Sequence, residues 1–164
     1  DSLLTYFSEE HILEFQRKND IKGNPIDISQ KTYIDSVFDR FAFETYNSLQ
    51  VYYKPDDKNF KILSIGGIIW YERDSKSYMN KLFEVRDLLK EQYKTPKIKE
   101  ELDRPTYDDE MGDSRYNLIT FIFENGEMIM ISCNDYDNEL LDIQDYFDLQ
   151  IYSAEITELL GFLE

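Results

Sequence analysis

Apolar residues recur every three or four positions in four parts of the chain, which is the spacing that gathers them on one face of an α-helix. The pattern predicts a helix that begins at Ser8 and ends near residues 18–25, and further helices over residues 27–41, 74–93 and 153–164. A serine or aspartate stands at each predicted start, where its side-chain oxygen can cap free backbone N–H groups.

Between these helices, runs of β-branched and aromatic residues alternate with turn residues, a pattern typical of antiparallel strands. We expect a hairpin over residues 41–55 and a strand over residues 60–72. The glycine pair Gly66-Gly67 inside that strand indicates either a bulge or a close approach of another group to the backbone.

The strongest hairpin pattern covers residues 115–133, where Asn125-Gly126 fits a two-residue type I′ turn. The polar residues 94–115 are expected to form a long loop. A last strand is expected over residues 146–153, in which apolar and polar side chains alternate between the two faces. The side chains expected to face inward are Phe147, Leu149 and Ile151, and those expected to face outward are Asp148 and Gln150.

Strands joined by hairpins and interrupted by single helices are typical of the α+β class. We therefore expect a single α+β domain over residues 1-164, with an antiparallel sheet of about five to six strands and helices packed mainly on one face. A helix ending in KGNP precedes the first group of strands and a helix ending in YKTP precedes the second. This weak likeness raises the alternative of an internal duplication, with repeats over residues 1-72 and 73-164.

The chain is strongly acidic, and its negative charge is concentrated in the last third. The chain holds 34 acidic and 18 basic residues, for a formal net charge of −16, and residues 116–164 hold 11 acids and no base. Phosphate contacts require lysine or arginine, so nucleic acid is not an expected partner of this part, and neither is an anionic membrane surface. A basic protein or a cation is what such a field attracts.

Several chemical classes are disfavoured by the residues present. The single cysteine, Cys133, excludes an intramolecular disulfide and a cysteine-rich metal cluster. A nucleophile system of the Ser-His or Cys-His kind would have to use the only histidine, His11. The chain also lacks the glycine-rich phosphate-binding motifs and the HExxH zinc motif. We therefore expect no enzymatic activity and no cofactor.

The origin of the chain is indicated only by general features. No apolar run approaches the roughly 18 residues that span a bilayer, so no membrane association is expected. The chain begins at Asp1 without a methionine, which favours an exported, processed protein. The heavy use of lysine, asparagine, isoleucine, tyrosine and aspartate is typical of a bacterial protein.

Two acidic clusters offer oxygen ligands of the kind that calcium prefers. In the first, acids alternate like the first three ligands of a helix-loop-helix calcium site, but position six is Leu140 rather than glycine and position twelve is Tyr146 rather than glutamate. A solvated loop is the simpler interpretation. The candidate ligands are Asp135, Asp137 and Glu139 in the first cluster, or Asp108, Asp109, Glu110 and Asp113 in the second.

The same residues suit a protein partner better. Tyrosines among carboxylates combine frequent interface hot spots with charges that steer a basic protein. The expected function is a non-enzymatic acidic binding module, similar in general character to inhibitors or immunity proteins, although no motif identifies such a family. The alternatives are an extracytoplasmic domain that binds calcium and a carboxylate-dependent hydrolase. The expected partner-binding residues are Asp135, Tyr136, Asp137, Glu139, Asp142, Asp145 and Tyr146.

Overall fold

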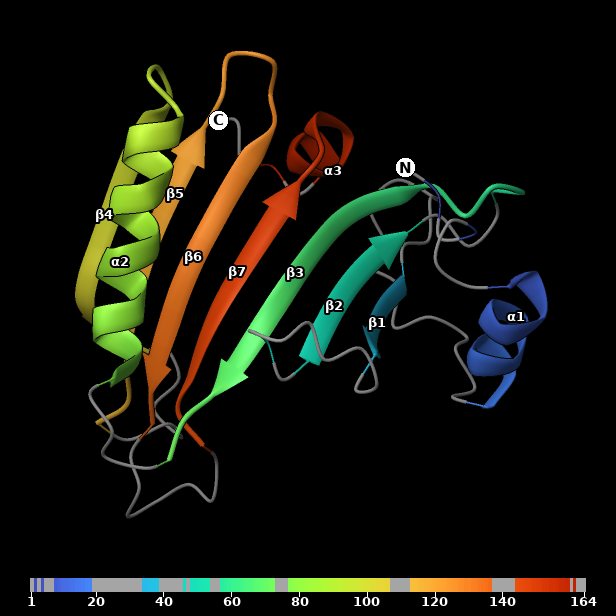
Figure 1. Ribbon diagram of the computed structural model, residues 1–164, viewed down its shortest axis with the longest axis horizontal. Helices are drawn as coiled ribbons and strands as arrows, with labels where there is room; N and C mark the ends of the chain where they lie inside the picture. The colour runs from blue at the N-terminus through green and yellow to red at the C-terminus, as the bar shows by residue number, and fades with distance from the viewer. Residues whose placement is uncertain are drawn as a thin grey trace.

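The computed structural model describes residues 2, 4, 8–18, 34–38, 46, 48–53, 57–72, 77–106, 113–136, 144–159 and 161. Three helices and seven strands lie in these ranges (Figure 1). In chain order they are α1 (Glu9–Lys18), β1 (Ile34–Phe38), β2 (Ser48–Tyr53), β3 (Ile62–Trp70), α2 (Ser77–Gln92), β4 (Lys97–Pro105), β5 (Arg115–Ile122), β6 (Met128–Asp135), β7 (Tyr146–Tyr152) and α3 (Ala154–Leu159).

The described strands form one sheet in the order β1-β2-β3-β7-β6-β5-β4, and every neighbouring pair is antiparallel. The α+β class and the antiparallel sheet are confirmed, with seven strands where about five to six were expected. A helix precedes a meander in each half of the chain, and the two meanders meet at the β3–β7 pair (Figure 1). The internal duplication remains a hypothesis.

Helix α2 covers one face of the second meander, as its stripe of apolar residues predicted. Tyr78, Leu82 and Val85 of the helix are buried against the sheet. The sheet residues beneath the helix that are buried with it are Ile119, Phe121, Ile129, Ile131, Cys133 and Phe147. This is the larger core of the described chain, and its apolar burial supplies the main favourable term in folding.

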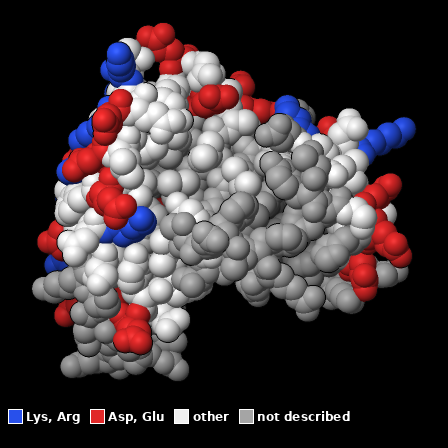
Figure 2. Space-filling model, viewed as in Figure 1, with Lys and Arg blue, Asp and Glu red and all other residues white. Residues whose placement is uncertain are grey.

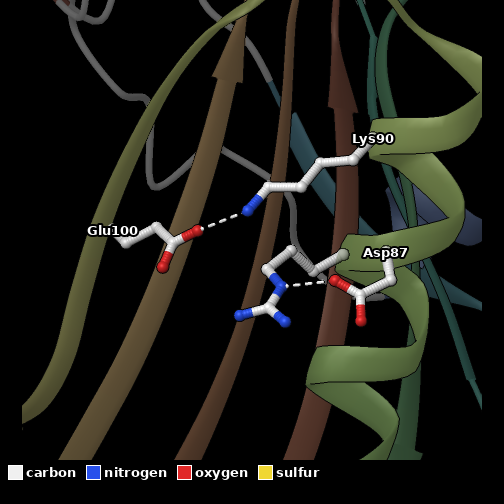
Figure 3. A network of polar contacts seen from close by, with 4 residues as sticks. Asp87, Lys90 and Glu100 are labelled. Atoms are coloured by element: carbon white, nitrogen blue, oxygen red, sulfur yellow. Dashed lines mark hydrogen bonds and ion pairs between the residues drawn. The ribbon is translucent and has the colours of Figure 1, made fainter.

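The outer side of α2 is charged. Lys90 of the helix pairs with Glu100 of β4 at 2.9 Å (Figure 3), and acidic and basic side chains intermingle over this part of the surface (Figure 2). Arg86 lies over the ring of Phe83, 4.7 Å from its centroid, and its Nε donates to Asp87 at 2.8 Å. Exposed ion pairs of this kind contribute little to stability, because solvent screens the attraction between the charges.

A second core lies beneath α1, in the first half of the chain. Ile12 of the helix is buried with Val51, Tyr53 and Phe60. The rings of Tyr53 and Phe60 pack edge to face, with centroids 6.2 Å apart. The predicted first helix is therefore confirmed.

The helix predicted over residues 27–41 is wrong where the structure describes it, because residues 34–38 form strand β1. This segment contains isoleucine, valine and phenylalanine, which favour strands as readily as an amphipathic helix. Antiparallel pairing of Ile34–Phe38 with β2 decides the outcome. In the hairpin predicted over residues 41–55, the second arm corresponds to β2, and the strand that pairs with β2 is β1. Part of the predicted first arm lies outside the described residues.

The loop predicted over residues 94–115 is wrong in its first part, because Lys97–Pro105 is strand β4. Only Ile98 and Glu101 are partly buried in this strand, so it lacks the alternation that marks a strand in a sequence. Strand β4 is at the edge of the sheet and pairs only with β5. Charged side chains suit an edge strand because they discourage pairing with other chains.

The hairpin predicted over residues 115–133 is confirmed, but its turn is not type I′. Gly126 has φ of 84°, whereas Asn125 is not among the residues with positive φ. The N–H of Gly126 donates to the carbonyl of Phe123 at 3.0 Å, and the N–H of Phe123 donates to Glu127 at 3.0 Å. This is a three-residue loop that ends on a left-handed glycine.

The glycine pair of β3 marks a close approach rather than a bulge, since the register with β7 is continuous from Ser64 to Trp70. The side chain of Gln150 occupies the space that a Cβ at Gly66 would need, and the ring of Tyr46 occupies that of Gly67.

The final strand, β7, differs from its predicted alternation. Phe147 faces inward as predicted, but Gln150 is only 3% exposed and Ile151 is 46% exposed. The side chain of Gln150 is buried because its end packs against Gly66 and accepts a hydrogen bond from Ser64 Oγ at 3.1 Å. Its Nε2 also donates to Gln50 of β2. Helix α3 follows this strand, shorter than the predicted 153–164 in the described residues.

Candidate functional site

The predicted partner-binding residues flank one acidic segment. Asp135 ends β6 and Tyr136 follows it, whereas Asp145 and Tyr146 lie at the start of β7. The other three predicted residues, Asp137, Glu139 and Asp142, are outside the described residues, as are Asp108, Asp109 and Glu110 of the second acidic cluster.

Both acidic segments are attached to the same end of the sheet, the lower end in Figure 1. The segment between β4 and β5 is closed at its base by a hydrogen bond from the N–H of Thr106 to the carbonyl of Ser114, at 3.1 Å. The segment between β6 and β7 is closed by the hydrogen bond from the N–H of Tyr136 to Asp145. The two bases are adjacent, because Asp135 pairs in register with Arg115, the residue after Ser114. In the described residues no group of three or more potential ligands could hold a metal ion. The calcium prediction stays a prediction.

Asp145 has a structural position rather than a surface one. The residue is 0% exposed, and its Oδ1 accepts a hydrogen bond from the N–H of Tyr136 at 3.0 Å. Its backbone carbonyl accepts from the N–H of Tyr71 at 2.9 Å. Asp145 thus ties the end of β6 and the residue after β3 to the start of β7, and its carboxylate is not available to a partner.

Asp135 lies on the side of the sheet covered by α2. A hydrogen bond between Tyr78 and Asp135 and the charge of that carboxylate add to burial, the largest cause, in raising the pKa of Tyr78. Burial likewise raises the pKa of the Cys133 thiol to about 12, with Asp135 and Asp145 adding to the shift and a hydrogen bond from Asn117 opposing it. The thiol is fully buried and stays protonated at neutral pH.

The opposite face of the sheet presents aromatic side chains at this same end. In the register, Trp70 pairs with Tyr146, Tyr146 pairs with Asn134, and Asn134 pairs with Tyr116. Directly paired residues share one face of an antiparallel sheet. These four residues form a line across β3, β7, β6 and β5, on the face away from α2.

Two of the rings in this line contact each other, and a third ring, that of Tyr136 just beyond the end of β6, lies against one of them. Trp70 and Tyr146 pack edge to face, with centroids 5.2 Å apart and planes at 65°. The ring of Tyr136 lies 6.0 Å from that of Tyr146. We call this set the aromatic row, which consists of Trp70, Tyr116, Tyr136 and Tyr146.

Two carboxylates flank the aromatic row. The hydroxyl of Tyr116 donates to Glu101 at 3.1 Å. Asp148 is two residues along β7 from Tyr146, and therefore on the same face. Burial is the largest cause of the raised pKa of Tyr146, and the neighbouring Tyr136 and the negative charge of Asp148 raise it further.

Trp70 is the part of the row that reaches solvent most. Its side chain is 42% exposed, and it is the only aromatic among the large hydrophobic residues that the described chain exposes. Tyr136, Tyr146 and Tyr116 are partly buried. Exposed aromatics beside carboxylates can contact a partner without a catalytic group being present.

The sequence indicated only part of this site. Tyr136 and Tyr146 were predicted, but Trp70, Tyr116 and Glu101 were not. The pairing of β3 with β7 joins segments 76 or more residues apart in sequence, and β4 was taken for a loop. The one available signal was the position of the only tryptophan at the end of a predicted strand.

In the described residues no helix is long and apolar enough to cross a membrane. No protein-family model matches the chain, and the comparisons with curated proteins and with solved structures found no match either. The function is therefore inferred from the geometry of the site.

Proposed function

We propose that the chain is a non-enzymatic binding module that engages a basic protein. The observation that carries this proposal is the aromatic row with Asp148 and Glu101 beside it, on the sheet face opposite α2. Trp and Tyr are the residues most often found as interface hot spots, because they bury a large area with few rotatable bonds.

The charge of the chain selects the kind of partner. The strands β6 and β7 belong to the part after Arg115, which has 11 acids and no base. Such a one-signed field speeds the approach of a basic protein and repels an acidic one. Carboxylates beside the aromatic row then fix the orientation of that partner.

The proposal is tested by a pull-down with three full-length baits. One is the wild type, one carries Asp148→Asn with Glu101→Gln, and one carries Glu124→Gln with Glu127→Gln at the far end of the sheet. The two variants have the same net charge. We expect a basic protein to be retained by the wild type and the far-end variant and lost by the other. Retention of the same proteins by all three baits would overturn the proposal.

Calcium binding and carboxylate-dependent hydrolysis stay predictions from the sequence, as do the bacterial origin and the exported location.

A further inference from the structure

We infer that strand β4 pairs with the same strand of a second copy of the chain, which joins two sheets edge to edge in a dimer. Among the described strands, β4 lies at one edge of the sheet and pairs there with β5. An edge strand presents backbone N–H and C=O groups that a further strand can bind. This inference goes beyond the proposed function, because it rests on the backbone and the charges of β4.

The hydrogen bonds of the neighbouring hairpin show how the backbone of β5 is oriented. The N–H of Phe123 donates to the carbonyl of Glu127, so these two residues form a hydrogen-bonded pair between the arms of the hairpin. Such pairs recur at every second residue of an antiparallel ladder, and the next one contains Phe121. The residues between them, which include Leu118 and Thr120, therefore direct their backbone groups toward β4.

The orientation of β5 fixes that of β4. Lys99 pairs with Thr120 and Glu101 pairs with Leu118, so both residues of β4 form hydrogen bonds with β5. Glu100 lies between them, and its N–H and C=O consequently point away from β5, to the outside of the sheet. An inverted second copy must place such outward-directed residues opposite one another, which allows only registers that differ by two residues.

The charges of β4 select one of these registers. The strand holds three basic and three acidic residues in a chain whose net charge is −16. With Glu100 opposite Glu100 of the second copy, Lys99 of each copy lies opposite Glu101 of the other. A shift by two residues places Lys99 opposite Lys99, or Glu101 opposite Glu101. Opposite charges stabilise a cross-strand pair and like charges destabilise it, so charges that discourage pairing with other strands favour this one.

Two features support this register at its centre. Lys99 and Glu101 of the second copy form a non-hydrogen-bonded pair, in which side chains approach more closely than in a hydrogen-bonded one. The two Glu100 residues meet at the twofold axis, and each already has a cation beside it, because Lys90 of α2 lies 2.9 Å from its carboxylate (Figure 3). That ion pair reduces the repulsion between the two carboxylates.

The bulge of β4 limits the length of the pairing. Regular pairing with β5 is interrupted after Glu101, and the N–H of Asp103 donates to Oδ1 of Asn117 at 2.8 Å instead of pointing outward. The pairing therefore ends at Leu102, which is 37% exposed and lies opposite Ile98 of the second copy. An interface of this length is small, which is typical of weak and reversible association.

The arrangement has a consequence for the rest of the molecule. A twofold axis perpendicular to the sheet keeps the two α2 helices on one face and the two aromatic rows on the other. A dimer thus presents two copies of the aromatic row on the same side.

Sedimentation velocity of the full chain, from about 10 µM to about 1 mM at physiological ionic strength, tests the inference. We expect a reversible monomer–dimer equilibrium with a dissociation constant of about 0.1 mM. Lys99→Glu and Glu101→Lys should each weaken the dimer about tenfold or more, because each places like charges opposite one another at two positions. The variant with both changes should recover the wild-type constant within about threefold, and a mixture of the two single variants should form a heterodimer.

Control variants separate this pairing from a general effect of net charge, and circular dichroism establishes that each is folded. Lys58→Glu and Glu158→Lys make the same changes of net charge at exposed residues outside β4, and each should alter the dissociation constant less than about twofold. Glu100→Pro removes the outward N–H at the axis and should abolish the dimer, whereas Glu100→Ala keeps this N–H and should retain it.

A chain that stays monomeric at about 1 mM would overturn the inference. A dimer that survives Glu100→Pro would place the interface elsewhere, and so would single charge reversals that the combined variant does not restore. Either result would equally overturn the pairing of β4 with its own copy.

Discussion

The two faces of the sheet differ in what covers them and in what their side chains can do. Beneath α2, the sheet contributes apolar residues such as Ile119, Phe121 and Phe147, all fully buried. On the opposite face, the same strands contribute Trp70 and Tyr146 at one end and the buried Gln150 further along. One set of strands thus forms the core on one side and holds the aromatic row on the other.

The difference follows from strand geometry. Successive residues of a strand point to opposite faces, so β7 sends Phe147 beneath the helix and Tyr146 and Asp148 to the other side. Substitutions on the two faces should therefore separate stability from binding. The predictions below test that separation, beginning with the largest expected effect.

Leu82→Ala should destabilise the protein most. Leu82 is fully buried at the centre of the α2 core, and truncation there leaves a cavity as well as removing apolar contact. We expect the free energy of unfolding to fall by about 2–5 kcal/mol, measured by urea denaturation. Leu88→Ala on the same helix, at a residue that is 55% exposed, is the control and should change it by about 0.5 kcal/mol or less. Similar losses for both would mean that α2 does not cover the sheet in this orientation.

Substitutions of Gly66 and Gly67 in β3 test the two faces at adjacent positions, because successive strand residues point to opposite faces. A Cβ at Gly67 would lie 2.5 Å from the ring of Tyr46, which must move as a whole, so Gly67→Ala should lower the free energy of unfolding by about 1–3 kcal/mol. A Cβ at Gly66 meets the flexible end of Gln150, so Gly66→Ala should lower it by about 1 kcal/mol, chiefly through the hydrogen bond with Ser64. Thermal melts of both variants would show the order reversed if Tyr46 yields more easily than Gln150.

The covered face could be predicted from the sequence better than the open one. The stripe of Tyr78, Leu82 and Val85 placed α2 on the sheet, since an amphipathic helix repeats every 3.6 residues over its whole length. The 115–133 hairpin was found because Asn125-Gly126 separates two apolar runs, which is a strong local signal for a hairpin.

The open face could not be predicted because it depends on pairing between distant segments. Nothing in the sequence states that Trp70 lies beside Tyr146, and the highly charged β4 carries no alternation that marks it as a strand. Acidic character alone also misplaced Asp145, whose carboxylate is buried and bonded to the backbone of Tyr136. Charge counts give the sign of the field around a chain, whereas strand register decides which side chains lie together at a surface.

The buried ionisable groups beneath α2 make stability depend on alkaline pH. The pKa of Cys133 is about 12 in the folded protein against an ordinary 9.0, and the pKa of Tyr78 is raised above 10.0. A raised folded-state pKa means that the folded protein holds its proton when the unfolded chain has lost it. The stability that these protonated groups contribute to the folded state is therefore complete below pH about 9 and is lost as pH rises toward about 12.

We expect the free energy of unfolding to fall by about 1 kcal/mol between pH 8 and pH 10, measured by urea denaturation. The free energy of unfolding of the Cys133→Ala variant should fall less between pH 8 and pH 10, although this variant is less stable than the wild type at pH 8. An identical pH dependence of the variant and the wild type would show that the pKa of Cys133 does not differ between the folded and the unfolded state.

The smallest effect on stability is expected at Trp70, the most exposed member of the aromatic row. Trp70→Leu removes an edge-to-face contact with Tyr146 and keeps an apolar side chain, so the free energy of unfolding should fall by about 1 kcal/mol or less in urea. A loss as large as that of Leu82→Ala would mean that Trp70 belongs to a core, and the two faces would not differ as the register indicates. A small loss of stability with a large loss of binding to a basic partner is the result that a partner-contacting surface explains, because a buried position loses both together and an idle surface position loses neither.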